Sequence, residues 1–97
     1  MKTVYWQSSN GVEFEWDPVK AALNRRKHGI SFPFAARVFL DQNRLERLDT
    51  REEYGEERWV VLGRVDEWVL VVLYTIRGSH IRIFSARKAD RNDYGNY

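Results

Sequence analysis

The first part of the chain alternates between hydrophobic and polar residues. This pattern runs from Val4 to Trp16 and surrounds the dipeptide Asn10-Gly11. Asn-Gly between β-prone flanks is typical of a tight turn that joins two antiparallel strands. We therefore expect a β-hairpin at the N-terminus.

Helical spacing replaces the alternation after Trp16. Asp17-Pro18 supplies an N-cap and a first-turn proline, and Gly29 is a natural C-terminal stop. Between them, three apolar residues recur at helical intervals: Val19, Ala22 and Leu23. Ser31 is expected to cap a second short helix that buries a stripe made of Phe32, Ala35, Ala36 and Phe39. Two helices joined by a four-residue loop form a helical hairpin.

The rest of the chain is dominated by β patterns. Residues 50–57 are polar and acidic and are predicted to be a loop. Four strands are predicted, at 44–49, Arg58–Val65, Trp68–Arg77 and His80–Ser85. Short turns between the last three require antiparallel pairing. Ser85 is expected to cap a last helix that runs through Asp93. The order ββ-αα-ββββ-α predicts an α+β fold, with an antiparallel sheet, two helices packed on one face and a short C-terminal helix.

Composition narrows the class of protein. With 97 residues and a hydrophobic fraction of 43%, the chain is expected to be one globular domain over residues 1–97. It has no cysteine, which excludes disulfides and thiolate metal sites. It has no membrane-spanning run and no secretory signal, so we expect a cytoplasmic protein without a membrane partner.

Charge is distributed unevenly along the chain. Residues 1–57 carry 9 basic and 10 acidic groups, and residues 58–97 carry 7 and 4, so their net charges are −1 and +3. Five of the fifteen residues from Arg77 to Arg91 are Lys or Arg. They are interspersed with the apolar residues of a predicted strand that includes Ile81-Arg82-Ile83-Phe84. Cations held on a rigid strand suit an ordered polyanion, which favours RNA. A solvated, mildly basic surface is the alternative.

Three stretches together resemble a known family. They are FEWDPVKAALNRRKHGISFPFAARVF (14–39), DTREEYGEERWVVLG (49–63) and IRIFSARKADRNDY (81–94). In combination they are similar to the BrnT-type toxins of bacterial type II toxin–antitoxin pairs, which have a RelE-like fold. The resemblance covers residues 14–97 and leaves residues 1–13 as an N-terminal extension or hairpin arm. Asp93 departs from the family, whose C-terminal helix usually carries Glu there and more arginines.

The resemblance implies a ribonuclease that inhibits translation, without a metal ion or cofactor. Its implied partners are RNA, a BrnA-like ribbon–helix–helix antitoxin, and operator DNA bound only through the antitoxin complex. Metal-free cleavage needs a base near the ribose 2′-OH, cations around the phosphate and an acid for the leaving 5′-oxygen. Arginine suits the cationic role because its planar fork binds two phosphate oxygens. The alternatives are a non-catalytic nucleic-acid-binding module and a partner-binding protein.

Six residues are candidates for catalysis: Lys27, His28, Glu57, Arg77, Arg82 and Arg87. Arg87 follows the last predicted strand, where its side chain can overhang the sheet. Arg82 lies within that strand, and the alternative for it is an ion pair with Glu56 or Glu57. Lys27 and His28 share a helix end, where both can also satisfy terminal carbonyls, and a histidine can donate or accept a proton near neutral pH. The alternatives for Glu57 and Arg77 are a solvated loop and a solvated turn.

Four further residues are candidates for RNA binding: Arg58, Arg64, Lys88 and Arg91. Arg58 and Arg64 share one face of a strand by parity and are expected to extend a track for phosphates. Other chemistries find little support. Two histidines 52 positions apart without cysteine make a poor zinc site, and there is no Gly-rich phosphate loop.

Overall fold

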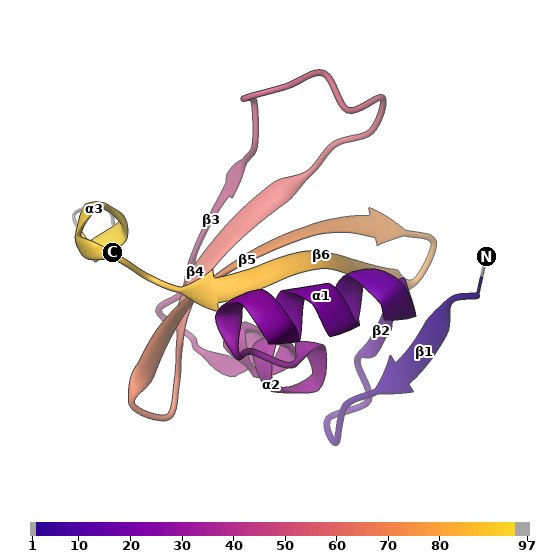
Figure 1. Ribbon diagram of the computed structural model, residues 1–97, viewed down its shortest axis with the longest axis horizontal. Coiled ribbons are helices and arrows are strands. Elements are labelled where there is room, and N and C mark those ends of the chain that lie inside the picture. The colour runs from indigo at the N-terminus through magenta and orange to yellow at the C-terminus, as the bar shows by residue number, and fades with distance from the viewer. Residues whose placement is uncertain (1, 95–97) are drawn as a thin grey trace.

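The protein is built around a six-stranded sheet with the strand order β1-β2-β6-β5-β4-β3 (Figure 1). The computed structural model describes residues 2–94, so Met1 and residues 95–97 of the predicted domain lie outside it. The strands are β1 (Val4–Gln7), β2 (Glu13–Trp16), β3 (Leu45–Leu48), β4 (Trp59–Val65), β5 (Trp68–Arg77) and β6 (His80–Lys88). The helices are α1 (Pro18–His28), α2 (Phe32–Ala36), the 3-10 helix η1 (Arg37–Leu40) and α3 (Arg91–Tyr94).

The expectation of a purely antiparallel sheet is wrong. Strands β1–β2, β3–β4, β4–β5 and β5–β6 pair antiparallel, but β2 pairs with β6 in parallel. This parallel contact joins only two residue pairs, Phe14 with Ile81 and Glu15 with Arg82. The cause is the topology of the chain. The N-terminal hairpin lies at the free edge of the last strand, β6, and α1, α2, η1 and three other strands separate β2 from β6 in the sequence. The fold is therefore α+β with a mixed sheet.

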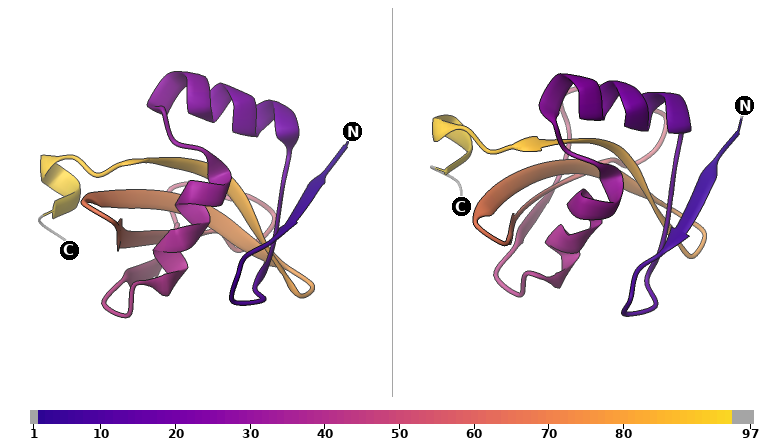
Figure 2. Two further views of the ribbon diagram at one scale, coloured as in Figure 1. Left: turned by 90° about the horizontal axis from the view of Figure 1, so that it is seen from below. Right: turned by 60° about the horizontal axis from the view of Figure 1, so that its bottom comes forward.

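The second helical segment closes one face of the sheet. Ser31 caps α2 by accepting from Phe34 N, and the predicted stripe of Phe32, Ala35 and Ala36 is buried in the core. Figure 2 shows α2 and η1 crossing this face, where they pack on side chains such as Val61, Val72 and Ile83. Gly63 makes the close approach possible, because a Cβ on it would lie 2.5 Å from the Val38 side chain.

Helix α1 lies alongside β6 and is fixed there by a buried asparagine (Figures 1 and 2). Asn24 Nδ2 donates to the carbonyl oxygens of Ala86 (2.8 Å) and Ile30 (3.1 Å), and the Ala86 amide donates to Asn24 Oδ1 (3.0 Å). The predicted helix limits are confirmed: Asp17 caps the start, and Gly29 ends it with a φ of 74°. The apolar residues Val19 and Leu23 point to solvent instead of the sheet.

Strand β6 continues to Lys88, so the prediction of a helix starting at Ser85 is wrong. A bulge explains the error. Tyr74 pairs with Ile83 and Leu73 with Ser85, which leaves Phe84 as an extra residue. The alternation of side chains is therefore shifted after Ile83, and Ala86 faces the core. Helix α3 begins only at Arg91, where the Asp93 amide donates to Asp90 Oδ1.

None of the helices within residues 2–94 is long and apolar enough to cross a membrane.

We predict that Asn24→Leu lowers the free energy of unfolding by about 2–4 kcal/mol, because it leaves buried backbone groups of Ala86 and Ile30 without partners. The measurement is urea denaturation followed by circular dichroism. The matched control is Leu23→Asn at the neighbouring exposed position, which is expected to change stability by less than about 1 kcal/mol. Equal losses in the two variants would contradict the role given to Asn24.

Candidate active site

The face of the sheet opposite α2 carries the candidate site. Strand register places its side chains in rows, because paired residues point to the same side. Val60, Leu73 and Ser85 form one row across β4, β5 and β6, and Leu62, Val71 and Arg87 form the next. This face therefore has an apolar floor that ends in a serine and an arginine on β6.

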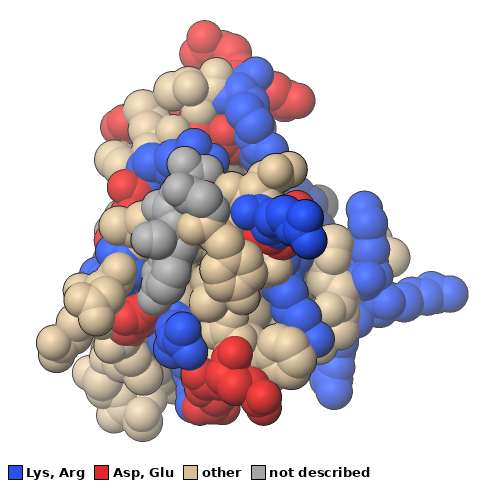
Figure 3. Space-filling view, turned by 90° about the vertical axis from the view of Figure 1, so that its left-hand side faces the viewer, with Lys and Arg blue, Asp and Glu red and all other residues tan. Residues whose placement is uncertain are grey.

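A hollow of about 430 Å³ lies over this floor. Its charged and titratable lining comes from α1, β3, the loop before β4, β6 and α3: Lys27, His28, Arg47, Asp49, Arg51, Arg87 and Asp93. Four cations and two carboxylates give it a net charge of +2 with histidine neutral. Figure 3 views the molecule from the end where α3 lies, and Lys and Arg side chains cross the middle of this side. The hollow is suited to a polyanion.

Helix α1 brings Lys27 and His28 to the hollow. These are its last two residues, and their position depends on the anchoring of the helix three and four residues earlier by Asn24. Gly29 turns the chain away directly afterwards. The structure thus brings together Lys27, His28 and Arg87, three of the six residues predicted to act in catalysis.

Arg87 lies on β6 and is held by Asp93 of α3. Its Nη1 and Nη2 lie 2.6 and 3.2 Å from the Asp93 carboxylate oxygens, and Nη1 also donates to the Lys88 carbonyl. Hydrogen bonds from Arg87 are the main cause that lowers the pKa of Asp93 to about 2. The same contact raises the pKa of Arg87. The Arg87 side chain remains 40% exposed and accessible from the hollow.

Arg51 is oriented by a buried carboxylate. Asp49 is 2% exposed, and it accepts hydrogen bonds from Arg51 Nε (2.8 Å), Arg51 Nη2 (2.9 Å) and the Tyr54 hydroxyl (2.9 Å). The hydrogen bonds from Arg51 hold the pKa of Asp49 far below its usual range. Because the Arg51 side chain is 73% exposed, this fixed guanidinium presents its outer edge to solvent at the rim of the hollow.

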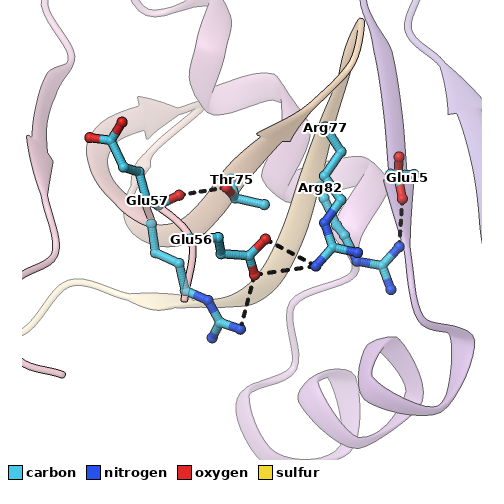
Figure 4. A network of polar contacts seen from close by, with 7 residues as sticks. Glu15, Glu56, Glu57, Thr75, Arg77 and Arg82 are labelled. Atoms are coloured by element: carbon cyan, nitrogen blue, oxygen red, sulfur yellow. Dashed lines mark hydrogen bonds and ion pairs between the residues drawn. The ribbon is translucent and has the colours of Figure 1, made fainter. Parts of the chain in front are cut away.

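Arg77 and Arg82 form a separate cluster on the same open face (Figure 4). Arg77 Nη2 lies 3.1 Å from Glu56, and Arg82 Nη1 lies 2.6 Å from Glu15 of β2. The alternative for Arg82, an ion pair with Glu56 or Glu57, is therefore wrong in its partner, because Arg82 pairs with Glu15. Figure 4 shows the Glu57 carboxylate pointing away from both arginines, while its backbone carbonyl accepts from the Thr75 hydroxyl. The structure does not bring Glu57, Arg77 or Arg82 to the hollow.

The four residues predicted to bind RNA are dispersed. Arg58 lies beside the Arg77 cluster, with its guanidinium carbon 3.8 Å from the centre of the Phe84 ring and 4.4 Å from that of Tyr54. Lys88 lies over the Trp68 ring at 3.8 Å. Arg64 lines a separate shallow hollow near the β4–β5 turn, and Arg91 is exposed at the start of α3.

Sequence reasoning missed Arg47, Asp49 and Arg51. Arg47 lies opposite Val60 on the edge strand β3, so it reaches the hollow only through strand pairing. The spacing of Asp49 and Arg51 contained a usable signal, because an aspartate two residues before an arginine at the end of a strand can hold the guanidinium in place. Within residues 2–94, no three His, Cys, Asp or Glu side chains are grouped to hold a metal ion.

The comparison with protein families matches residues 16–93 to the ribonuclease toxin BrnT of type II toxin–antitoxin systems. The chain belongs to the BrnT toxin family. The match covers every residue that lines the basic hollow. A search of curated proteins found no match. Members of the BrnT family are ribonuclease toxins of type II toxin–antitoxin systems, so an RNA substrate and a protein antitoxin follow for this chain.

We predict that the Asp93 carboxyl titrates at about pH 2 in the folded protein. Because this lies below the ordinary aspartate value of about 3.9, the ion pair with Arg87 is fully formed above about pH 4 and is lost as the pH falls through the folded-state pKa. The measurement is NMR of the Asp93 side-chain carboxyl carbon. Arg87→Ala is expected to raise the midpoint, whereas Arg91→Ala, at an exposed position in the same helix, leaves it in place. A midpoint near 4 in the unmodified protein would contradict the contact.

Proposed function

We propose that this BrnT-family protein is an endoribonuclease toxin that cleaves RNA without a metal ion and thereby inhibits translation. One observation carries the proposal: cations from four separate elements (Lys27, Arg47, Arg51 and Arg87) meet His28 around a single hollow. Charges placed around one point can stabilise a phosphate that gains negative charge during reaction.

The proposed reaction is an internal transesterification. The ribose 2′-oxygen forms a bond to the adjacent phosphorus, and the bond from phosphorus to the 5′-oxygen breaks. A base accepts the 2′-OH proton, and an acid returns a proton to the leaving 5′-oxygen. The products are a 2′,3′-cyclic phosphate and a 5′-hydroxyl. Because no electrons are transferred, side chains alone can supply every proton and charge that this step requires.

The lining of the hollow suggests how the roles are divided. Arg87 and Arg51 present planar guanidinium groups and suit the non-bridging phosphate oxygens. His28 is the lining residue best suited to proton transfer near neutral pH, with Lys27 beside it as a further cation. Asp93 holds Arg87 in orientation, and a phosphate can take its place because the contact is partly exposed.

The cluster of Arg77 and Arg82, together with the neighbouring Arg58, is proposed to extend the binding of RNA along the sheet. Arg58, Arg77 and Arg82 lie on the same open face as the hollow, and Arg58 adds two aromatic neighbours that suit an unstacked base. Each of these cations is engaged by Glu56 or Glu15, so RNA phosphates have to compete with carboxylates there. We assign these three arginines to substrate binding.

The proposal also covers the fold type, the kind of antitoxin and the place where the toxin acts. The order of two helices followed by antiparallel strands supports a RelE-like arrangement of the toxin. The antitoxin is proposed to be BrnA-like, of ribbon–helix–helix type, and the complex to bind operator DNA through it. The site of action is proposed to be the cytoplasm, where RNA under translation is available.

We predict that Arg87→Ala lowers the rate of RNA cleavage at least about 100-fold, as expected for loss of a charge-stabilising donor. The assay measures single-turnover cleavage of a labelled RNA with and without EDTA, and the 3′ ends are checked for cyclic phosphate. Arg64→Ala, at an arginine outside the hollow, is the matched control and is expected to lower the rate less than about threefold, as a peripheral contact should. EDTA is expected to leave the rate unchanged.

The outcomes distinguish this proposal from its alternatives. Full activity of Arg87→Ala would refute the place of Arg87 in the reaction. Loss of activity in EDTA would refute metal independence. RNA binding without cleavage by the unmodified protein would favour a non-catalytic nucleic-acid-binding module, and absence of both would favour a protein that only binds its partner.

We further predict that the complex with the antitoxin binds RNA at least about tenfold more weakly than the free toxin, because the partner should cover cations that RNA uses. Fluorescence anisotropy with the same labelled RNA at fixed salt measures both affinities. An affinity unchanged by the antitoxin would count against inhibition by occlusion.

A further inference from the structure

Helix α1 presents three apolar side chains outward, while its Ala21 packs against the core. Val19 is 65% exposed and Leu23 56%, and Ala22 between them is also exposed. These residues are spaced i, i+3 and i+4, so they form one stripe opposite the buried Asn24. Figure 1 shows α1 on the outside of the molecule with no other element in front of it. Single exposed leucines are ordinary, but an outward stripe on a helix that buries an asparagine calls for an explanation.

The polar part of α1 has one sign of charge. The helix carries Lys20, Arg25, Arg26 and Lys27 and no acidic residue. Within residues 2–94, none of these four cations has an ion pair with a carboxylate, in contrast to Arg77, Arg82 and Arg87 of the sheet. A helix with an apolar stripe and unpaired cations is complementary to an amphipathic segment whose apolar side chains are flanked by Asp and Glu.

The stripe lies next to the basic hollow. Lys20 and Lys27 are seven residues apart, so they share the flank of α1 that faces the open side of the sheet. Lys27 lines the hollow, and the Lys20 ammonium lies 5.6 Å from the centre of the Phe84 ring. A segment seated on the stripe with acidic residues on that flank would therefore reach the mouth of the hollow without entering it.

We propose that the stripe formed by Val19, Ala22 and Leu23 is a docking surface for an acidic amphipathic segment of the protein antitoxin. The segment places its apolar side chains on the stripe and its carboxylates on Lys20 and Lys27. Neutralising these cations removes part of the positive field that attracts RNA to the hollow. This inference rests on the proposed function, since it deepens the account of how the toxin is inhibited.

The test compares two double variants of the full chain. V19S/L23S removes the stripe, and L40S/I76S removes two apolar side chains that are equally exposed elsewhere, each at 56%. The probe is the purified antitoxin encoded in the same operon, and its Kd is measured by isothermal titration calorimetry. V19S/L23S is expected to weaken binding at least about tenfold, as for removal of central apolar contacts. L40S/I76S should change it less than about twofold.

A charge variant and an activity control complete the experiment. Lys20→Glu, at a cation that the segment is proposed to contact and that does not line the hollow, should weaken antitoxin binding and make it less dependent on salt. Free V19S/L23S should cleave RNA at the rate of the unmodified protein, because neither residue lines the hollow. Circular dichroism establishes that each variant is folded.

Each outcome supports or overturns the inference. Antitoxin affinity that is equal in V19S/L23S and the unmodified chain overturns it. Loss of RNA binding with antitoxin binding retained overturns it in favour of a nucleic-acid surface, and conversion of a dimer to a monomer overturns it in favour of a contact between copies. If the unmodified protein binds antitoxin but cleaves no RNA, the proposed ribonuclease function fails, while a selective loss of antitoxin binding in V19S/L23S still supports the docking surface.

Discussion

The arrangement of the site depends on one buried amide. Strand β2 pairs with β6 only at Phe14 and Glu15, so the edge of β6 beyond Ile83 has no strand partner on that side. Asn24 takes the place of a strand by accepting from the Ala86 amide and donating to its carbonyl. An amide side chain can do both because it carries a donor and an acceptor. This contact fixes α1 against the sheet and thereby sets the positions of Lys27 and His28.

Carboxylates hold several of the arginines around the open face, and these ion pairs affect how the site can bind a phosphate. Asp49 holds Arg51, Asp93 holds Arg87, and Glu56 and Glu15 hold Arg77 and Arg82. The exposed pairs among them contribute at most about 1 kcal/mol to stability, so their main effect is to fix the direction of each guanidinium. A phosphate that replaces a carboxylate then meets a donor already in position, with less conformational entropy to lose.

Local signals made much of the fold predictable. Asp17-Pro18, Gly29 and Ser31 marked the helix ends correctly, and the continuous apolar run of β5 gave its limits. The features that could not be predicted from the sequence are mainly contacts between residues far apart in the chain. The parallel contact of β2 with β6 and the ion pair of Arg82 with Glu15 join residues more than sixty positions apart. The bulge at Phe84 shifted the alternation and imitated the end of a strand.

The difference between local signals and non-local contacts also explains which site residues could be predicted from the sequence. Lys27, His28 and Arg87 follow from charge, helix ends and resemblance, whereas Arg47 and Arg51 depend on how an edge strand and a loop fold over the sheet.

The two faces of α1 show why the hydrophobic pattern alone does not predict which face of this helix is buried. The inner face must hydrogen-bond a strand edge, so it needs Asn24 where a leucine would leave the edge of β6 unsatisfied. With that contact supplied by an amide, α1 contributes only Ala21 to the edge of the core, and Val19, Ala22 and Leu23 are not needed there. They are left on the surface of the same helix that carries Lys27 and His28, which places any partner of that helix beside the hollow.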